Sequence, residues 1–232
     1  MCAATDWKQK CQSEWKLKGR DIPAPDGVDW KSVHSKKPFN RNLLKNPAPH
    51  GLSHTQPPPE LPAPGFGDEP PRFEPEGDFK DWTTSTERLP LDSSGIPEGA
   101  AICHLPQYSW FTMEQHVDLL GQGLWVELLD SYQPDICIQD WYEETLLHKS
   151  LYQLQVKLLG ADRKTVIQEH SVSPEEDQSQ DEHRWKEVSH KFRGYGPGVR
   201  HVHFLHRLKC MSMIGFQATR ATDSAVLVRL RD

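Results

Sequence analysis

The chain has 232 residues, of which 36% are hydrophobic and 26% charged, and its mean hydropathy is −0.71. This length fits one large domain or two small ones, and the polar composition predicts that part of the chain lies outside a packed core. The net charge is −6, and residues 81–232 hold 22 acidic against 15 basic side chains, which argues against nucleic acid as a partner. No run approaches the roughly 18 apolar residues of a membrane-spanning helix, so we expect neither a transmembrane segment nor an apolar signal peptide.

The first segment, residues 1–46, is basic and carries one helical pattern. Trp7, Cys11 and Trp15 recur at the four-residue spacing of one helix face, which predicts a short helix. Gly19 follows this pattern and ends it. The rest of the segment has few strong apolar residues, so we do not expect it to fold alone.

Residues 47–78 are rich in proline. Ten of the nineteen prolines lie between Pro47 and Pro75. Because proline lacks a backbone donor and disfavours helix in the residue before it, neither helix nor sheet can propagate here, and we predict an extended linker. The string QPPPELPAP also has the P-x-x-P spacing of ligands for aromatic-lined grooves, which is an alternative to a simple spacer.

Residues 79–232 have mainly the patterns of strands. The string VDLLGQGLWVELLD, which begins at Val117, predicts short helical turns broken by glycines. From Leu151 to Val172, two runs with alternating apolar residues flank the polar string ADRK, which predicts a hairpin. A later run alternates as well, with His201 and His203 on one face.

The strand patterns together predict the fold class. About seven or eight short strands are separated by turn signals, with at most two short helices. We therefore expect an all-β protein in which residues 79–232 form an antiparallel β-sandwich, preceded by a short, partly helical N-terminal segment and the proline-rich linker.

The sequence shows no pattern for catalysis or cofactor binding. His201, His203 and His206 form an H-x-H-x-x-H run, but only His201 and His203 share a strand face, and no carboxylate or cysteine lies beside them in the sequence. The five cysteines have no C-x-x-C spacing, and no nucleophile motif occurs. We predict no catalytic residue, no cofactor and no metal site, and therefore a protein that is not an enzyme.

Two aromatic residues, Tyr108 and Trp110, lie in a proline-containing stretch that we expect to be a loop. An exposed aromatic ring on a sandwich loop can stack on a sugar ring or on a side chain of a partner. The alternative is that these rings pack in the core.

The chain contains five strings in a fixed order: RNLLKNP, VDLLGQGLWVELLDSYQPDICIQDWYE, YQLQVKLLGADRKTVI, VSHKFRGYGPGVRHVHFLH and TRATDSAVLV. In this order they resemble the F-box associated domain of the sugar-recognising F-box proteins. The resemblance covers about Asn40 to Val228. It implies an antiparallel β-sandwich of the jelly-roll, galactose-binding-like type, which agrees with the fold class predicted above.

The resemblance also implies partners. Members of this family hold an F-box that docks the Skp adaptor of a cullin ubiquitin ligase, and their sandwich binds high-mannose glycans of misfolded glycoproteins. The string WKQKCQSEW resembles only the trailing end of an F-box region. Ubiquitin-ligase components are therefore partners by family analogy, but we do not expect direct docking of the Skp adaptor.

A ligand site in two loops is implied as well. The early aromatic position of the family corresponds to Tyr108, and its late Tyr-Trp-Lys run corresponds to Ser212, Met213 and Ile214. Without the tryptophan face and the lysine donor, we expect weak binding of the usual chitobiose glycan, or none. Methionine offers a flexible apolar contact instead.

These observations predict a non-enzymatic recognition module that binds a glycoprotein or protein ligand in the cytoplasm, related to ubiquitin-dependent glycoprotein degradation. An alternative implied by the resemblance is a cell-surface receptor of non-specific cytotoxic cells, associated with the plasma membrane through a partner. The sequence has no spanning segment, signal peptide or N-x-Ser/Thr acceptor site that would favour this alternative.

Overall fold

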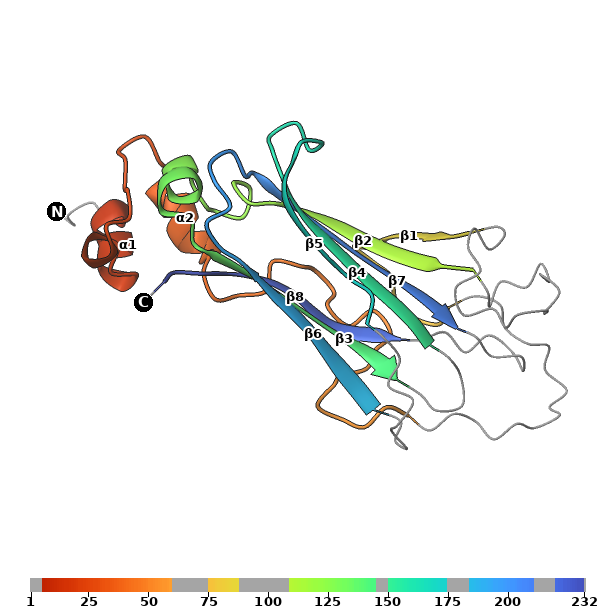
Figure 1. The fold of residues 1–232 in the computed structure, drawn as a ribbon. Helices are drawn as coiled ribbons and strands as arrows, with labels where there is room; N and C mark the ends of the chain where they lie inside the picture. Colours follow the sequence, from red (N-terminus) through yellow and green to blue (C-terminus); the bar gives the residue numbers. More distant parts are fainter. Residues whose placement is uncertain are drawn as a thin grey trace, which may run out of the picture.

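The computed structural model describes residues 6–59, 75–87, 109–144, 150–174, 184–210 and 220–231. Two β-sheets pack face to face in these residues (Figure 1). The five-stranded sheet has the order β1 (Thr83–Thr86), β2 (Phe111–Asp118), β7 (His201–Cys210), β4 (Ser150–Leu159) and β5 (Val166–Val172). The three-stranded sheet has the order β6 (Arg184–Phe192), β3 (Asp135–Glu144) and β8 (Ala221–Arg229). All pairings between these strands are antiparallel, which confirms the predicted all-β sandwich.

Side chains alternate along each strand, so one face of each sheet points toward the core. In β7, Val202 and Phe204 are fully buried, whereas His203 lies on the outer face. Strands β4 and β5 pair with Leu154 opposite Val172, which confirms the predicted hairpin.

One predicted element is wrong in its first part. Val117 belongs to β2 and not to a helical turn, because buried and exposed residues alternate along Phe111–Asp118 and the strand pairs with β7. The helical turn predicted after Gly123 is present, because residues 126–132 have helical backbone, with a π-helical turn over Leu128–Tyr132.

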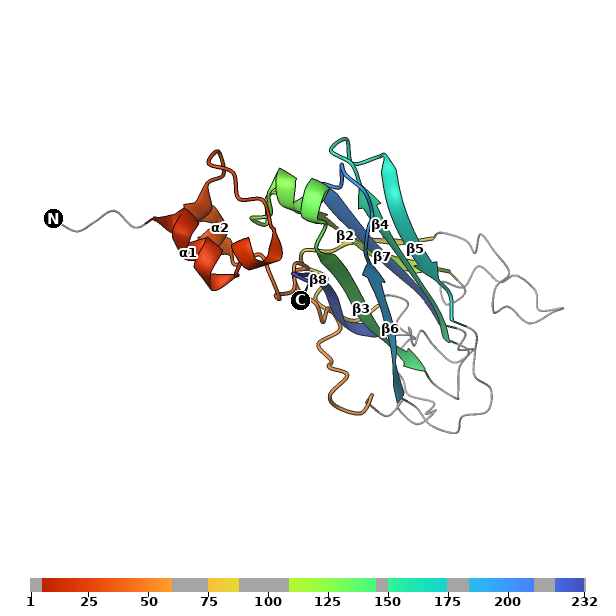
Figure 2. The ribbon, with the colours of Figure 1, turned by 60° about the vertical axis from the view of Figure 1, so that its left-hand side comes forward.

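Two helices cover one end of the sandwich (Figure 2). The predicted helix is confirmed as α1 (Trp7–Glu14), while α2 (Trp30–Lys36) is an element that the sequence analysis does not predict. Trp30 meets Trp125 edge to face, with ring centroids 5.0 Å apart, and the indole of Trp125 donates to the carbonyl of Pro23 at 2.7 Å. The N-terminal helices and the sandwich therefore share one hydrophobic core. None of the helices in the described ranges is long and apolar enough to cross a membrane.

Residues 40–47, which we call the closing segment, cover one open side of the sandwich. Three backbone hydrogen bonds join this segment to the free edge of β8, from the amides of Asn40, Leu43 and Ser224 to the carbonyls of Val228, Val226 and Pro47, at 3.0, 2.8 and 3.0 Å. On the other sheet, the side chain of Gln115 accepts from the amide of Lys45 at 3.1 Å and donates to its carbonyl at 2.7 Å. The closing segment thus bridges the two sheets and satisfies the backbone groups that an edge strand would otherwise expose.

The opposite side of the sandwich lies between β5 and β6. There His170 stacks on His190, with ring centroids 3.8 Å apart and ring planes 4° apart. Desolvation holds the pKa of both rings below the ordinary value, and the charge of His170 adds to this effect on His190. Both rings are therefore neutral at neutral pH and stack without charge repulsion.

Asn42 is the side chain that fixes the closing segment to β8. Its amide donates to the carbonyl of Ser224 at 2.8 Å, and its Oδ1 accepts from the amide of Val226 at 3.1 Å. Asn42→Ala leaves these partly buried backbone groups without partners, so we expect the free energy of unfolding in urea to fall by about 2 kcal/mol. Lys45→Ala in the same segment removes only an exposed ion pair with Asp81 and should cost less than about 0.5 kcal/mol. Equal losses in the two variants would contradict this role of Asn42.

Candidate functional site

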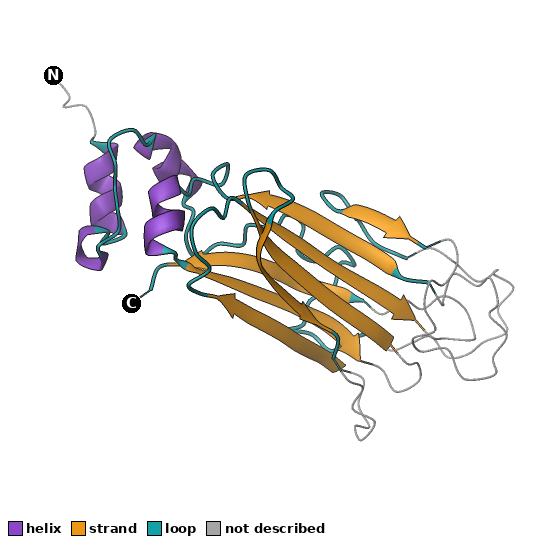
Figure 3. Ribbon diagram, turned by 45° about the horizontal axis from the view of Figure 1, so that its top comes forward, coloured by secondary structure: helices purple, strands orange, loops and turns teal. Residues whose placement is uncertain are grey.

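The predicted ligand residues lie outside the described residues; they are Tyr108, Ser212, Met213 and Ile214. Their described neighbours lie side by side, because β2 begins at Phe111, β7 ends at Cys210, and Phe111 is the register partner of Leu208. The two chain segments that carry the predicted residues therefore join the sandwich at adjacent strand ends. These strand ends lie at the end of the sandwich away from α1 and α2 (Figure 1), and we call this part of the sandwich the far end; Figure 3 shows the helices at the opposite end.

Trp110 anchors the start of β2 at the far end. The residue is 1% exposed, and its ring lies under two cations, with the guanidinium of Arg207 4.6 Å and the ammonium of Lys209 5.3 Å from the ring centroid. Its backbone is fixed as well, because its amide donates to the carboxylate of Glu87 at 3.2 Å and its carbonyl accepts from the amide of Glu87 at 3.2 Å. Trp110 is thus buried beside Arg207 and Lys209 and is not an exposed stacking platform.

Glu143 and Arg220 anchor the far end of the three-stranded sheet. The guanidinium of Arg220 donates to both carboxylate oxygens of Glu143 at 2.6 Å, and the amide of Glu143 donates to the carbonyl of Arg220 at 2.9 Å. The side chain of Glu143 is 3% exposed and that of Arg220 is 24% exposed. A bidentate pair with this little exposure holds β3 and the start of β8 in one fixed geometry.

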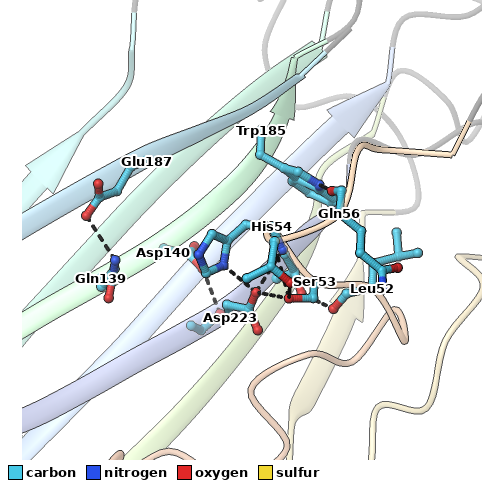
Figure 4. Close-up of polar contacts among 12 residues, drawn as sticks. Leu52, Ser53, His54, Gln56, Gln139, Asp140, Trp185, Glu187 and Asp223 are labelled. Carbon is cyan, nitrogen blue, oxygen red and sulfur yellow. Dashed lines mark hydrogen bonds and ion pairs between the residues drawn. The ribbon is translucent and has the colours of Figure 1, made fainter.

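Residues 52–56, which we call the strap, cross the outer face of the three-stranded sheet (Figure 4). Each strand of this sheet contacts the strap. The hydroxyl of Thr222 donates to the carbonyl of Leu52 at 2.6 Å, the ring of His54 stacks on Trp141 at 4.1 Å, and the indole of Trp185 donates to the carbonyl of Gln56 at 2.9 Å. This part of the proline-rich stretch is therefore bound to the sandwich.

Asp223 of β8 fastens the strap by a single oxygen atom. Its Oδ2 accepts from the hydroxyl of Ser53 at 3.0 Å, from the amide of His54 at 2.9 Å and contacts Nδ1 of His54 at 2.5 Å (Figure 4). Burial alone would raise the pKa of Asp223, but these hydrogen bonds outweigh burial and hold the pKa below its ordinary value. Because the hydroxyl of Ser53 bonds to Asp223 and not to His54, this group has no nucleophile paired with a base.

Asp140 lies at the centre of a polar network inside the sandwich. Its carboxylate accepts from the hydroxyls of Tyr152 and Ser224 at 2.6 and 2.7 Å and contacts Nδ1 of His206 at 2.7 Å. Burial, and then the nearby Asp140, raise the pKa of Tyr152 well above its ordinary value, so its hydroxyl remains a donor. Asp140 and His206 are both 0% exposed, so the network links strands of both sheets and cannot meet a substrate.

Sequence reasoning missed this network, because its four members come from four different strands. The one signal in the sequence is Asp140 itself, a polar residue at an inward position of an otherwise apolar alternation. His206 lies inside the sandwich while His203 lies outside, which confirms that the H-x-H-x-x-H run does not share one face.

Two shallow grooves lie on the outer faces of the sheets. The groove on the five-stranded sheet has a volume of about 530 Å³, and Arg207 donates to Gln153 at 2.7 Å along its wall. The groove on the three-stranded sheet has a volume of about 510 Å³ and contains the hydrogen bond of 3.0 Å from Gln139 to Glu187 (Figure 4). Amide and charged groups in both grooves suit ligands that form hydrogen bonds.

The role of Asp223 predicts a pH-dependent stability. Because the folded state lowers its pKa, Asp223 stabilises the fold at neutral pH, and this contribution disappears as the pH falls through the folded pKa. We expect the free energy of unfolding of Asp223→Asn to be about 1 kcal/mol lower than that of the parent at pH 7. This difference should shrink below about pH 4. Asp21→Asn is the matched control, since Asp21 is exposed and has the same left-handed backbone, with φ of 53° against 51°. A difference that stayed constant from pH 7 to pH 3 would contradict this assignment.

Comparison with known proteins assigns the chain to a family. The model of the F-box associated region matches residues 34–228. F-box only protein 50 of Danio rerio is 59% identical over 231 residues, with 97% of each chain covered. F-box only protein 50 of Homo sapiens is 39% identical over 226 residues, which cover 97% of this chain and 75% of the relative. F-box only protein 2 of Bos taurus is 32% identical over 227 residues, which cover 96% of this chain and 70% of the relative. This sandwich, with the closing segment included in the match, belongs to the F-box associated region family.

Proposed function

We propose that this chain is a recognition module that binds glycoprotein or protein ligands at the far end of its sandwich and catalyses no reaction. The observation that carries the proposal is the family match, which extends over the closing segment and both sheets. The anchors at Trp110 and Glu143 support it, because they hold adjacent strand ends in fixed geometry. Binding residues on loops need such a rigid base.

Two of the acid–histidine pairs have structural roles, Asp140 with His206 and Asp223 with His54. These roles are consistent with recognition rather than catalysis. Asp140 and His206 are enclosed in the core, and Asp223 with His54 holds the strap. Neither pair places a nucleophile beside a base at an open surface.

The ligand class follows from the predicted site residues. Tyr108 supplies an aromatic ring, while Ser212, Met213 and Ile214 supply neither a flat aromatic face nor a cationic donor. We propose that the far end binds the chitobiose core weakly and that its principal ligand presents an apolar surface, for which methionine is suited.

We place this activity in the cytoplasm. The relatives named above are F-box only proteins, and ubiquitin-ligase components are proposed partners by this relationship. The proposal does not include direct docking of the Skp adaptor, since the N-terminal helices pack on the sandwich through Trp30 and Trp125.

Glycan binding tests the predicted site. We expect the parent chain to bind immobilised chitobiose and high-mannose glycans weakly. The triple substitution Ser212→Tyr, Met213→Trp and Ile214→Lys adds a stacking face and a donor, and it should raise the affinity at least about tenfold.

Adding Tyr108→Ala to the triple variant should remove this gain. Tyr132→Ala, at the helical end, is the matched control and should leave the gain intact, with tryptophan fluorescence confirming that each protein is folded. No gain in the triple variant would show that residues 212–214 do not correspond to the sugar site.

Protease treatment of intact cells tests the cytoplasmic location. We expect the chain to stay at full length while a cell-surface protein in the same sample is cleaved. Cleavage of the chain on intact cells would contradict the proposal and favour the receptor of non-specific cytotoxic cells.

A further inference from the structure

Three potential metal ligands converge on the outer face of the five-stranded sheet. Glu114 and His116 are two residues apart in β2, so their side chains lie on the same face. His203 of β7 is the register partner of His116. Directly opposite and diagonal positions of an antiparallel pair bring side chains within about 5 to 8 Å of each other, close enough for long side chains to meet.

The side chains of these residues are already in contact. Nε2 of His203 lies 2.7 Å from Oε2 of Glu114, and the rings of His116 and His203 stack with centroids 4.2 Å apart and planes 7° apart. One potential ligand atom from each residue lies within 4.8 Å of the other two. The side chains of His203 and Glu114 are 14% and 31% exposed, and His116 is exposed, so an ion can reach them from solvent.

We propose that Glu114, His116 and His203 form a binding site for a divalent transition-metal ion of the zinc type. Two imidazoles and one carboxylate are a ligand set that zinc accepts, with a fourth position left to water or to a group of a partner. Calcium and magnesium prefer oxygen ligands and do not fit this set. The site is separate from the far end and does not depend on ligand recognition there.

The geometry needs only small adjustments. Ligand atoms around a tetrahedral zinc ion are about 3.4 Å apart, given bonds of about 2.0 to 2.1 Å. Nε2 of His203 and Oε2 of Glu114 are 2.7 Å apart, so these two atoms must move apart by less than about 1 Å when an ion takes the place of the proton between them. The ring of His116 must turn out of the stack so that a nitrogen lone pair meets the ion, and its exposed position leaves space for this rotation.

Exposure and ligand chemistry at the site favour a metal ion. The ring of His116 is exposed, so an ion can approach it from solvent. Glu114 supplies a carboxylate oxygen beside the two imidazoles. An ion bound there would link β2 to β7 beside the groove that Leu205 lines, since Leu205 is the register partner of Glu114.

Sequence analysis predicts no metal site, because it follows ligands along one strand. His201 and His203 share a face, but the partners of His203 come from β2. Glu114 lies 89 residues before His203 in the sequence. Only the pairing of β2 with β7 brings them together.

Zinc titration of the full chain tests the site. With reactive thiols blocked by iodoacetamide and residual metal removed by EDTA, calorimetry with zinc chloride should show one bound ion per chain. Loss of a residue that only supports a metal ligand commonly lowers the metal affinity about tenfold to a hundredfold. Loss of a ligand itself should cost at least as much. We therefore expect Glu114→Gln, His116→Gln and His203→Gln each to lower the zinc affinity at least about tenfold.

Two matched variants separate this site from other histidines. His34→Gln removes a histidine paired with a single carboxylate, Glu14 at 3.0 Å, and His170→Gln breaks the stacked pair with His190. Both should leave the zinc affinity unchanged. His116→Gln tests the site without disturbing the contact between Glu114 and His203, and thermal melting without metal will establish that it folds.

Zinc should also raise the melting temperature of the parent but not of the three ligand variants. Failure of the parent to bind one zinc ion would overturn the proposal. Equal zinc affinity in the parent and in the three ligand variants would overturn it as well.

Discussion

The pairing of the closing segment with β8 is the constraint on which the rest of the structure depends. A sandwich of five and three strands leaves β8 with a free edge, and residues 40–47 cover this edge with backbone hydrogen bonds. The same segment reaches the other sheet through Gln115. The closing segment therefore sets the positions of α2, which precedes it in the chain, and of the strap, which follows it.

The two ends of the sandwich are held by different forces. At the helical end, aromatic rings such as Trp30 and Trp125 join helices and strands in one apolar core. At the far end, charges hold the strand ends, with Arg207 and Lys209 over Trp110 in one sheet and Glu143 with Arg220 in the other. A base fixed in this way can carry different ligand residues without change in the strands, as the proposed recognition function requires.

Local patterns predicted the strands well and long-range contacts poorly. The hairpin of β4 and β5 and the two faces of β7 follow from alternation within a few residues. Val117 was misassigned because its string also fits a helical period, and only the pairing with β7 decides between the two. The network around Asp140 and the contact between Glu114 and His203 join strands far apart in the sequence. The predicted ligand residues Ser212, Met213 and Ile214 rest on the family resemblance alone, whereas Tyr108 is also indicated by its place in a proline-containing stretch.

Hydrogen–deuterium exchange of the native full chain tests most directly whether the closing segment is part of the sandwich. If it is, the amides of Asn40 and Leu43 exchange as slowly as those within β8, because their hydrogen bonds open only when the sheet edge opens. Exchange of these two amides at the rate of an unstructured peptide, while β8 stays protected, would contradict the account.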